Sequence, residues 1–229
     1  MTYSTEDLPI RRKTWLKTAA IPRSRMGWDF EDCDGLEPGD IAKVMKWIDA
    51  VKNGQVIMAD GKKSCGRGLL FYGKPGNGKT TLALVILQYI LRTFPIEAFN
   101  PSQNKSLVRP VYFTTFSELL ATKGYEMDGD PDAERLYLGM LGECADDAYN
   151  IRILVIDDAG QEHTSGTGWQ RSIMHHVLRT RFNKGLPTIV TTNVELGAWD
   201  ATYGEATESF AREAFNYLIL KATRGDMRK

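Results

Sequence analysis

The segment GLLFYGKPGNGKTTLALVILQYIL, Gly68 to Leu91, decides the fold that this sequence predicts. It places a glycine-rich loop between two apolar runs. The first run, GLLFYG, is typical of a buried strand, and the second predicts a helix from about Lys79 to Arg92. That helix is apolar nearly all round, so we expect it to be buried against a sheet. The loop between them, Gly73 to Thr80, matches the pattern G-x-x-x-x-G-K-[ST] in full.

The glycine loop predicts a binding site for a nucleoside triphosphate. A backbone that curls around phosphates points successive N–H groups inward, and glycines allow that close approach. The helix that begins near Lys79 adds the positive end of its dipole. We expect Lys79 to reach the β- and γ-phosphates, the Thr80 hydroxyl to bind Mg²⁺, and Thr81 to bond the α-phosphate. The expected nucleotide-binding residues are Gly73, Lys74, Pro75, Gly76, Asn77, Gly78, Lys79, Thr80 and Thr81.

Two acids at the end of an apolar strand predict the magnesium-binding half of the site. The segment ILVIDDAG, Ile153 to Gly160, predicts a buried strand that runs into Asp157 and Asp158. Ligands bind at the carboxyl ends of the strands in an open parallel sheet. We expect Asp157 to hold Mg²⁺ and Asp158 to activate or orient the attacking water, with Glu162 as a nearby rival for the second role.

Two further polar residues are candidates for the hydrolytic step. The segment PTIVTTN predicts a strand that ends at Asn193. If this strand lies between the loop strand and the Asp157 strand, Asn193 points at the γ-phosphate and helps to place the water; the alternative is an ordinary asparagine turn. Arg212, in YGEATESFAREAF, is either a solvated helix residue or an arginine finger that reaches the γ-phosphate of a neighbouring subunit.

The remaining segments alternate strands with helices. PGDIAKVMKWIDAVKNG predicts a helix that is capped by Asp40, and its expected apolar face consists of Ile41, Val44, Met45, Ile48 and Val51. RPVYFTTFSELL predicts a strand, a Ser or Thr cap and a helix, whereas residues 124–150 are acidic and expected to be irregular. GWQRSIMHHVLRTRFNKG and ESFAREAF predict helices, and NYLIL a last strand. This alternation indicates an α/β fold with at least five strands in a parallel sheet covered on both faces.

The composition narrows the class of protein. The 229 residues carry 29 Lys and Arg against 29 Asp and Glu, so no overall charge drives the chain toward nucleic acid. No apolar stretch reaches the roughly 18–20 residues of a membrane span, and the N-terminus has no apolar core of a signal peptide. The three cysteines, Cys33, Cys65 and Cys144, are far apart and form no metal or redox motif. We therefore expect a cytoplasmic protein without a membrane partner.

Taken together, these motifs resemble the AAA+ ATPases and, within them, the DnaC/IstB-like group of helicase loaders and transposition helper ATPases. The similar segments cover about residues 19–229 and are AAIPRSRMGWDFED, GLLFYGKPGNGKTTLA, VYFTTFSELL, LVIDDAGQEHTS, LRTRFNKGLPTIVTTN and GEATESFAREAF. The resemblance implies a five-stranded sheet in the order 5-1-4-3-2, ATP as ligand and head-to-tail self-association. It also implies that Arg212 acts in trans and that Arg181 lies at a subunit contact. The chain ends soon after the fifth strand, so no separate lid domain is expected.

The resemblance implies an ATPase that helps to place a replicative helicase on single-stranded DNA. Residues 1–36 would form an N-terminal arm and entry segment, and residues 37–229 the ATPase core. The candidates for partner binding are the basic residues of the arm, and the alternative is that the arm is a solvated tail. These residues are Arg11, Arg12, Lys13 and Lys17, together with Trp15. An IstB-like transposition helper, which binds duplex DNA and recruits a transposase, is the alternative within the same fold. A small-molecule kinase with the same loop is a third hypothesis.

Overall fold

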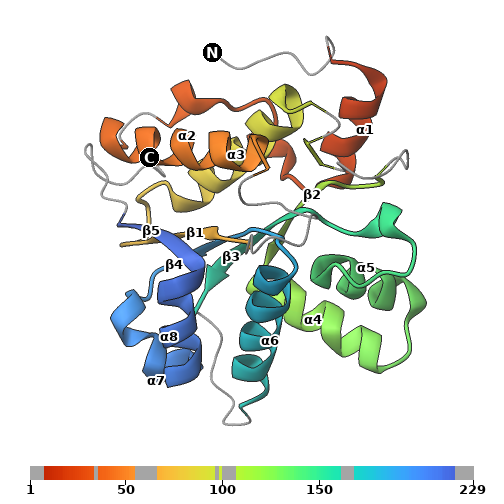
Figure 1. Cartoon of the computed structure of the whole chain (residues 1–229), viewed down its shortest axis with the longest axis vertical. Helices are drawn as coiled ribbons and strands as arrows, with labels where there is room; N and C mark the ends of the chain where they lie inside the picture. The colour runs from red at the N-terminus through yellow and green to blue at the C-terminus, as the bar shows by residue number, and fades with distance from the viewer. Residues whose placement is uncertain are drawn as a thin grey trace.

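A five-stranded parallel sheet forms the centre of the molecule (Figure 1). The computed structural model describes residues 8–33, 36–54, 66–95, 98–99, 107–160 and 168–219. The strands are β1 (Gly68–Tyr72), β2 (Val111–Thr115), β3 (Ile153–Ala159), β4 (Thr188–Thr192) and β5 (Phe215–Ile219). Their order across the sheet is β2-β3-β4-β1-β5, which confirms the expected α/β class and strand order.

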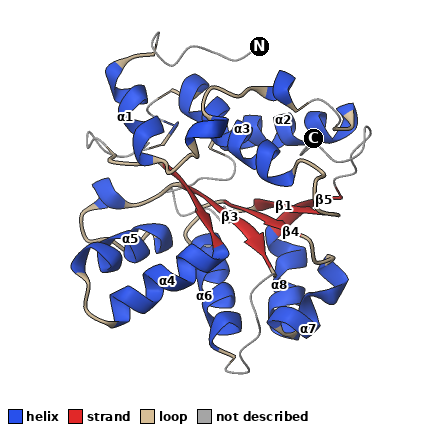
Figure 2. Ribbon diagram, turned by 180° about the vertical axis from the view of Figure 1, so that it is seen from behind, coloured by secondary structure: helices blue, strands red, loops and turns tan. Residues whose placement is uncertain are grey.

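Helices cover both faces of the sheet (Figure 2). On one face lie α1 (Ile10–Thr18), α2 (Pro38–Lys52) and α3 (Lys79–Thr93). On the other lie α4 (Phe116–Met127), α5 (Pro131–Leu141), α6 (Trp169–Asn183), α7 (Trp199–Tyr203) and α8 (Glu205–Ala214). Short 3₁₀ turns also lie between these elements, among them Arg23–Arg25 (η1), Phe30–Asp32 (η2), Asp147–Tyr149 (η4) and Leu196–Ala198 (η5).

The alternation of side chains along the strands divides the core into two layers. Successive residues of a strand point to opposite faces of the sheet. In β1, Leu69 and Phe71 pack with α1, α2 and α3, whereas Leu70 packs with the helices of the other face. Helix α3 is buried as expected, since every side chain from Leu82 to Leu87 is at most 1 % exposed. The glycine loop is thereby fixed between a central strand and a buried helix.

Helix α1 belongs to this core and is not a detached arm. Trp15 is 2 % exposed, and its indole N–H donates to the carbonyl of Leu107 over 2.8 Å. The Arg12 guanidinium donates to the carbonyls of Leu91 and Phe94, which close the C-terminal end of α3. The expectation that Trp15 serves a partner is therefore wrong, because its ring is buried. The division of the chain at residue 36 stays a prediction.

Two local expectations differ from the structure. Helix α2 begins at Pro38 with Glu37 as its N-cap residue, so Asp40 lies inside the first turn and pairs with Lys43 over 2.9 Å. Proline suits the first helical position because its missing N–H would have no partner there. The apolar face is largely as expected, with Val44, Ile48 and Val51 buried and Ile41 and Met45 half-buried, but Trp47 joins it.

Residues 124–150, expected to be irregular, are mostly helical. Helix α4 extends to Met127 and α5 follows from Pro131. The Asp130 carboxylate accepts from the amides of Asp132 and Ala133 and so caps α5. Acidic side chains in the first turn of a helix interact favourably with the positive end of its dipole. The acidic run therefore stabilises the start of a helix. Its buried side chains include Tyr137, Met140 and Leu141, at the spacing of one helix face.

The buried side chain of Arg181, on α6, links this helix by hydrogen bonds to residues in and beside the sheet. That side chain is 0 % exposed, so the expectation of a subunit contact is wrong. All five guanidinium N–H groups donate to neutral oxygens. The acceptors are Thr188 Oγ1 and the carbonyls of Met140, Ile151, Arg152 and Pro187. Burial, aided by the nearby charge of Arg152, lowers the pKa of Arg181 to about 9.

Replacing Arg181 by Leu should destabilise the fold by about 3 kcal/mol or more, because it leaves several buried carbonyls without a donor. Urea unfolding followed by circular dichroism measures this loss. The control is Arg179→Leu in the same helix, an exposed position whose guanidinium lies 5.2 Å from the Phe210 ring centroid. Equal stabilities of the two variants would contradict the role given to Arg181.

Candidate nucleotide-binding site

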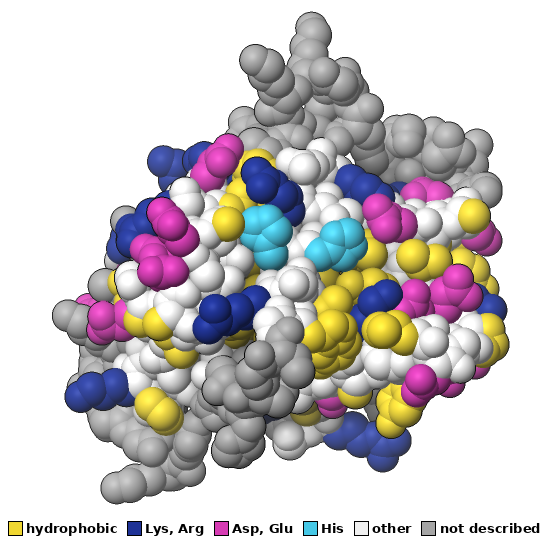
Figure 3. All heavy atoms as spheres, turned by 90° about the horizontal axis from the view of Figure 1, so that it is seen from below, with side chains coloured by type: hydrophobic (Ala, Val, Ile, Leu, Met, Phe, Trp, Pro, Cys, Tyr) yellow, Lys and Arg dark blue, Asp and Glu magenta, His cyan; other side chains and the backbone are white. Residues whose placement is uncertain are grey.

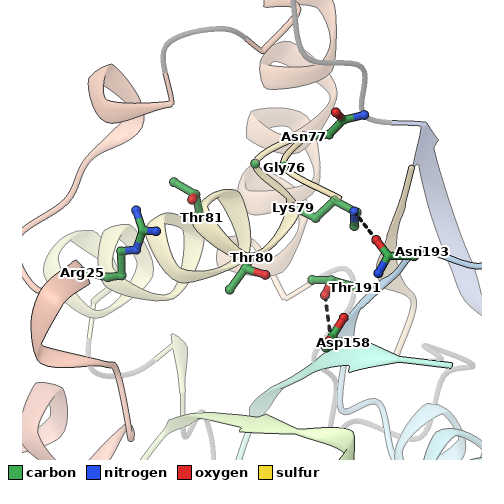
Figure 4. Close-up of a pocket in the computed structure, with 10 residues that line it drawn as sticks. Arg25, Gly76, Asn77, Lys79, Thr80, Thr81, Asp158, Thr191 and Asn193 are labelled. Atoms are coloured by element: carbon green, nitrogen blue, oxygen red, sulfur yellow. Dashed lines mark hydrogen bonds between the residues drawn. The ribbon is translucent and has the colours of Figure 1, made fainter. Parts of the chain in front are cut away.

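A polar pocket lies where β1, β3 and β4 end, at the start of α3 (Figure 4). Ligands of open parallel sheets bind at this edge. The residues that line the pocket are Arg25, Gly76, Asn77, Gly78, Lys79, Thr80, Thr81, Asp158, Thr191 and Asn193. Most of the residues predicted from the two sequence motifs therefore converge on one pocket. Their roles toward a nucleotide stay predictions.

The loop that follows β1 has the backbone that its glycines predict. Gly76 and Gly78 have φ angles of 83° and 76°, in the left-handed region that side chains other than glycine rarely adopt. Gly78 is also the N-cap residue of α3, and as a glycine it offers no side chain to cap the amides of the first turn. The start of α3 therefore faces the pocket with its backbone N–H groups and the positive end of its dipole.

Lys79 is held at the centre of the loop. Its side chain is 8 % exposed. The ammonium group donates to the carbonyls of Gly73 and Lys74 and to Asn193 Oδ1, each over 2.8 Å. Gly73 and Lys74 thus take part through their backbone, and Pro75 is an exposed residue of the loop. The charge of Lys79 is fixed between the loop and the end of β4.

Thr80 and Asp157 meet although they lie 77 residues apart in the chain. The Thr80 hydroxyl donates to Asp157 Oδ1 over 2.9 Å, and the Thr191 hydroxyl donates to the same oxygen over 2.5 Å. Burial raises the pKa of the Asp157 carboxyl, and the hydrogen bonds from Thr191 and Thr80 oppose that rise. A hydroxyl and a carboxylate oxygen thus lie together at one point below the loop.

Asp158 lies on a distorted part of β3. The register between β3 and β4 shifts between Ile156 and Ala159, and Asp158 has a φ angle of 58°. Such a bulge redirects a side chain, and a positive φ is uncommon for a residue other than glycine. The Asp158 amide donates to Thr191 Oγ1 over 3.0 Å, while its exposed side chain lines the pocket. The bulge places Asp157 inward and Asp158 toward the pocket.

The strand that ends at Asn193 lies between the loop strand and the Asp157 strand, which is the arrangement that its expected role requires. Strand β4 pairs with β1 on one side and with β3 on the other, so its end lies between the loop and the two acids. Arg212, in contrast, lies on α8 outside this pocket and forms an ion pair with Glu208. Its guanidinium side chain is 55 % exposed. Glu162, the rival of Asp158 for activating the water, falls outside the described residues.

Two residues that line the pocket, Thr191 and Arg25, were not predicted from the sequence. Thr191 bridges the acids, since its hydroxyl accepts from the Asp158 amide and donates to Asp157. The polar run TTN at the strand end was a signal for it. Arg25 comes from the entry segment, far from the loop in sequence, and no local pattern singles it out.

No family model and no curated protein matches the sequence. A crystal structure of the DnaC helicase loader superposes with a TM-score of 0.59 at 22 % identity, over 87 % of this chain and 100 % of that one. A DnaI structure matches with a TM-score of 0.59 at 18 % identity, over 91 % and 95 %. AMPPCP-bound DnaA from Aquifex aeolicus matches with a TM-score of 0.53 at 11 % identity, over 84 % of this chain and 49 % of that protein.

The sheet order and these similarities define an AAA+ fold of the P-loop class. Within that class, the fold is DnaC-like, because the similarity spans 100 % of the DnaC chain and 95 % of the DnaI chain. None of the described helices is long and apolar enough to cross a membrane.

Proposed function

We propose that this chain is an ATP-dependent, DnaC-like helicase loader. The observation that carries the proposal is that Lys79, Thr80 and Asn193 line one pocket of a DnaC-like fold, with the buried Asp157 hydrogen-bonded to Thr80. ATP would bind with its phosphates along the loop, the first turn of α3 and Lys79. The replicative helicase and single-stranded DNA are its proposed partners, and it would act in DNA replication.

The residues present suit Mg²⁺. Thr80 Oγ1 lies 2.9 Å from Asp157 Oδ1, and hydroxyl and carboxylate oxygens are the ligands that this hard cation prefers. Thr80 and Asp157 would hold it, Asp157 through water. When bound, Mg²⁺ would neutralise charge on the phosphates.

The same pocket offers groups for hydrolysis of the γ-phosphate. Asp158 would accept a proton from the attacking water, and Asn193 would help to place that water. Lys79 would stabilise the negative charge that develops on the phosphate oxygens. These three side chains all line the pocket, which supports their joint action on one phosphate.

Arg212 would complete the site of a neighbouring subunit. Its guanidinium is exposed and lies 2.5 Å from the Glu208 carboxylate, a surface pair of little energetic value that a γ-phosphate could replace. ATP would thus favour head-to-tail association, and hydrolysis would weaken it. The exposed Arg11 and Lys17 of α1 remain candidates for contact with the helicase.

Arg212→Ala should leave ATP binding by single subunits intact and reduce turnover by about 100-fold, because the trans cation is lost. The measurements are equilibrium ATP binding at low protein concentration and phosphate release at high concentration. The matched control is Arg135→Ala, which removes another exposed helix arginine that forms an i,i+3 ion pair. Normal phosphate release by Arg212→Ala would contradict the trans-site hypothesis.

The loader function is tested by native mass spectrometry of the protein with ATP, single-stranded DNA and the replicative helicase of its source. We expect an ATP-dependent complex that contains this chain and the helicase. A parallel sample contains duplex DNA and a transposase in place of the helicase. Assembly in that sample alone would refute the loader function and support the transposition alternative.

A further inference from the structure

The nucleotide pocket contains a second cation that the glycine-loop pattern does not include. Arg25 ends the 3₁₀ turn η1 in the segment between α1 and α2, and its side chain lines the pocket together with Lys79. We propose that Arg25 binds the α-phosphate side of the nucleotide in the same subunit. This inference rests on the proposed nucleotide site and adds a phosphate-binding residue to it.

The backbone beside Arg25 is anchored on α3. Gln88 is 0 % exposed, and its side-chain amide donates to the Arg25 carbonyl over 3.0 Å. The Gln88 side-chain oxygen accepts from the Gly27 amide over 2.8 Å. A buried side chain therefore fixes the position of this turn relative to the helix that starts at the glycine loop.

The helix geometry sets where Arg25 can reach. Gln88 and Thr81 are seven residues apart, so they lie on the same face of α3, about 10 Å apart along its axis. A side chain that starts beside Gln88 and extends along this face arrives next to Thr81. Figure 4 shows Arg25 at the Thr81 end of the pocket, on the side away from Lys79 and Asn193.

The guanidinium of Arg25 is oriented for an anion. Its central carbon lies 4.2 Å from the centroid of the Trp28 ring, so the aromatic face supports one side of the planar group. Within the described part of the chain, no carboxylate forms an ion pair with Arg25. Stacking leaves the N–H groups at the edge of the guanidinium able to donate to phosphate oxygens.

The position of Arg25 assigns the phosphate that it contacts. Lys79 occupies the end of the pocket next to Asn193, where the γ-phosphate is expected. Thr81 is the residue expected at the α-phosphate, and Arg25 lies at that end. ATP and ADP share the α-phosphate, so Arg25 strengthens the binding of both nucleotides, whereas a γ-phosphate contact strengthens ATP alone.

The test is calorimetric binding of ATP and of ADP to the full chain and to Arg25→Gln. We expect the variant to bind both nucleotides about 10- to 100-fold more weakly, and its affinity to depend less on KCl concentration. Arg25→Lys keeps the charge and should recover part of the loss. The control is Arg23→Gln, an exposed arginine of the same turn that does not line the pocket.

The possible outcomes distinguish failure of the proposed nucleotide site from failure of the role given to Arg25. Wild-type protein that binds neither nucleotide would refute the proposed nucleotide site and the inference with it. If the wild type binds both nucleotides and Arg25→Gln binds them as strongly as Arg23→Gln does, the role of Arg25 is refuted while the nucleotide site stands. Loss of ATP binding with normal ADP binding would place Arg25 at the γ-phosphate and overturn its assignment to the α-phosphate.

Discussion

Lys79→Ala is expected to weaken ATP binding by at least about 100-fold. A buried ammonium that bonds phosphate oxygens contributes about 1.5–3 kcal/mol for each charged hydrogen bond, and two such bonds account for this loss. The structure supports a large effect, because Lys79 is only 8 % exposed and is held by the carbonyls of Gly73 and Lys74. Titration calorimetry with ATP and Mg²⁺ measures the affinity.

Two controls separate a lost phosphate contact from a damaged loop. Thermal unfolding of Lys79→Ala shows whether the fold persists without the bonds to Gly73 and Lys74. Lys43→Ala removes a lysine of α2 that is 65 % exposed and should bind ATP as the wild type does. A folded Lys79→Ala protein with wild-type affinity for ATP would refute the assignment of the glycine loop.

The parts of the site that sequence predicts best are those fixed by local geometry or by strand direction. The glycine loop and the start of α3 follow from one contiguous motif, because the left-handed Gly76 and Gly78 and the helix start depend on neighbours in the chain. The meeting of Thr80 with Asp157 follows from a general rule, since parallel strands end at the same edge of a sheet. The place of Asn193 needed the strand order, which the family resemblance supplied.

The features that sequence did not predict depend on contacts between distant segments. Arg25 reaches the pocket because Gln88 anchors its turn, 63 residues away in the chain. The burial of Trp15 and Arg181 depends on backbone carbonyls that accept hydrogen bonds from their N–H groups. Every residue has such a carbonyl, so the sequence does not show which ones will be acceptors. An arginine in an amphipathic helix is usually solvated, so nothing short of the packed structure distinguishes Arg181 from Arg179.

Asp158→Asn is expected to preserve ATP binding and to reduce ATP hydrolysis by about 100-fold or more, the usual contribution of a general base. The change is nearly isosteric. It also suits the backbone, since Asp158 has a φ angle of 58° and asparagine tolerates the left-handed region as aspartate does. The bulge in β3 and the bond from the residue-158 amide to Thr191 should therefore survive, and only the proton acceptor is lost.

Binding and turnover should therefore separate in this variant, in contrast to Lys79→Ala, which loses both. Phosphate release and ATP affinity are measured on the same preparation, with Asp200→Asn, an exposed acid of α7, as the control. Glu162→Gln is assayed in parallel because Glu162 is the rival for the same role. If Asp158→Asn hydrolyses ATP normally while Glu162→Gln does not, the proton acceptor is Glu162. If Asp158→Asn alone is inactive, ATP should hold its subunits together, because the γ-phosphate that attracts Arg212 of a neighbouring subunit is no longer removed.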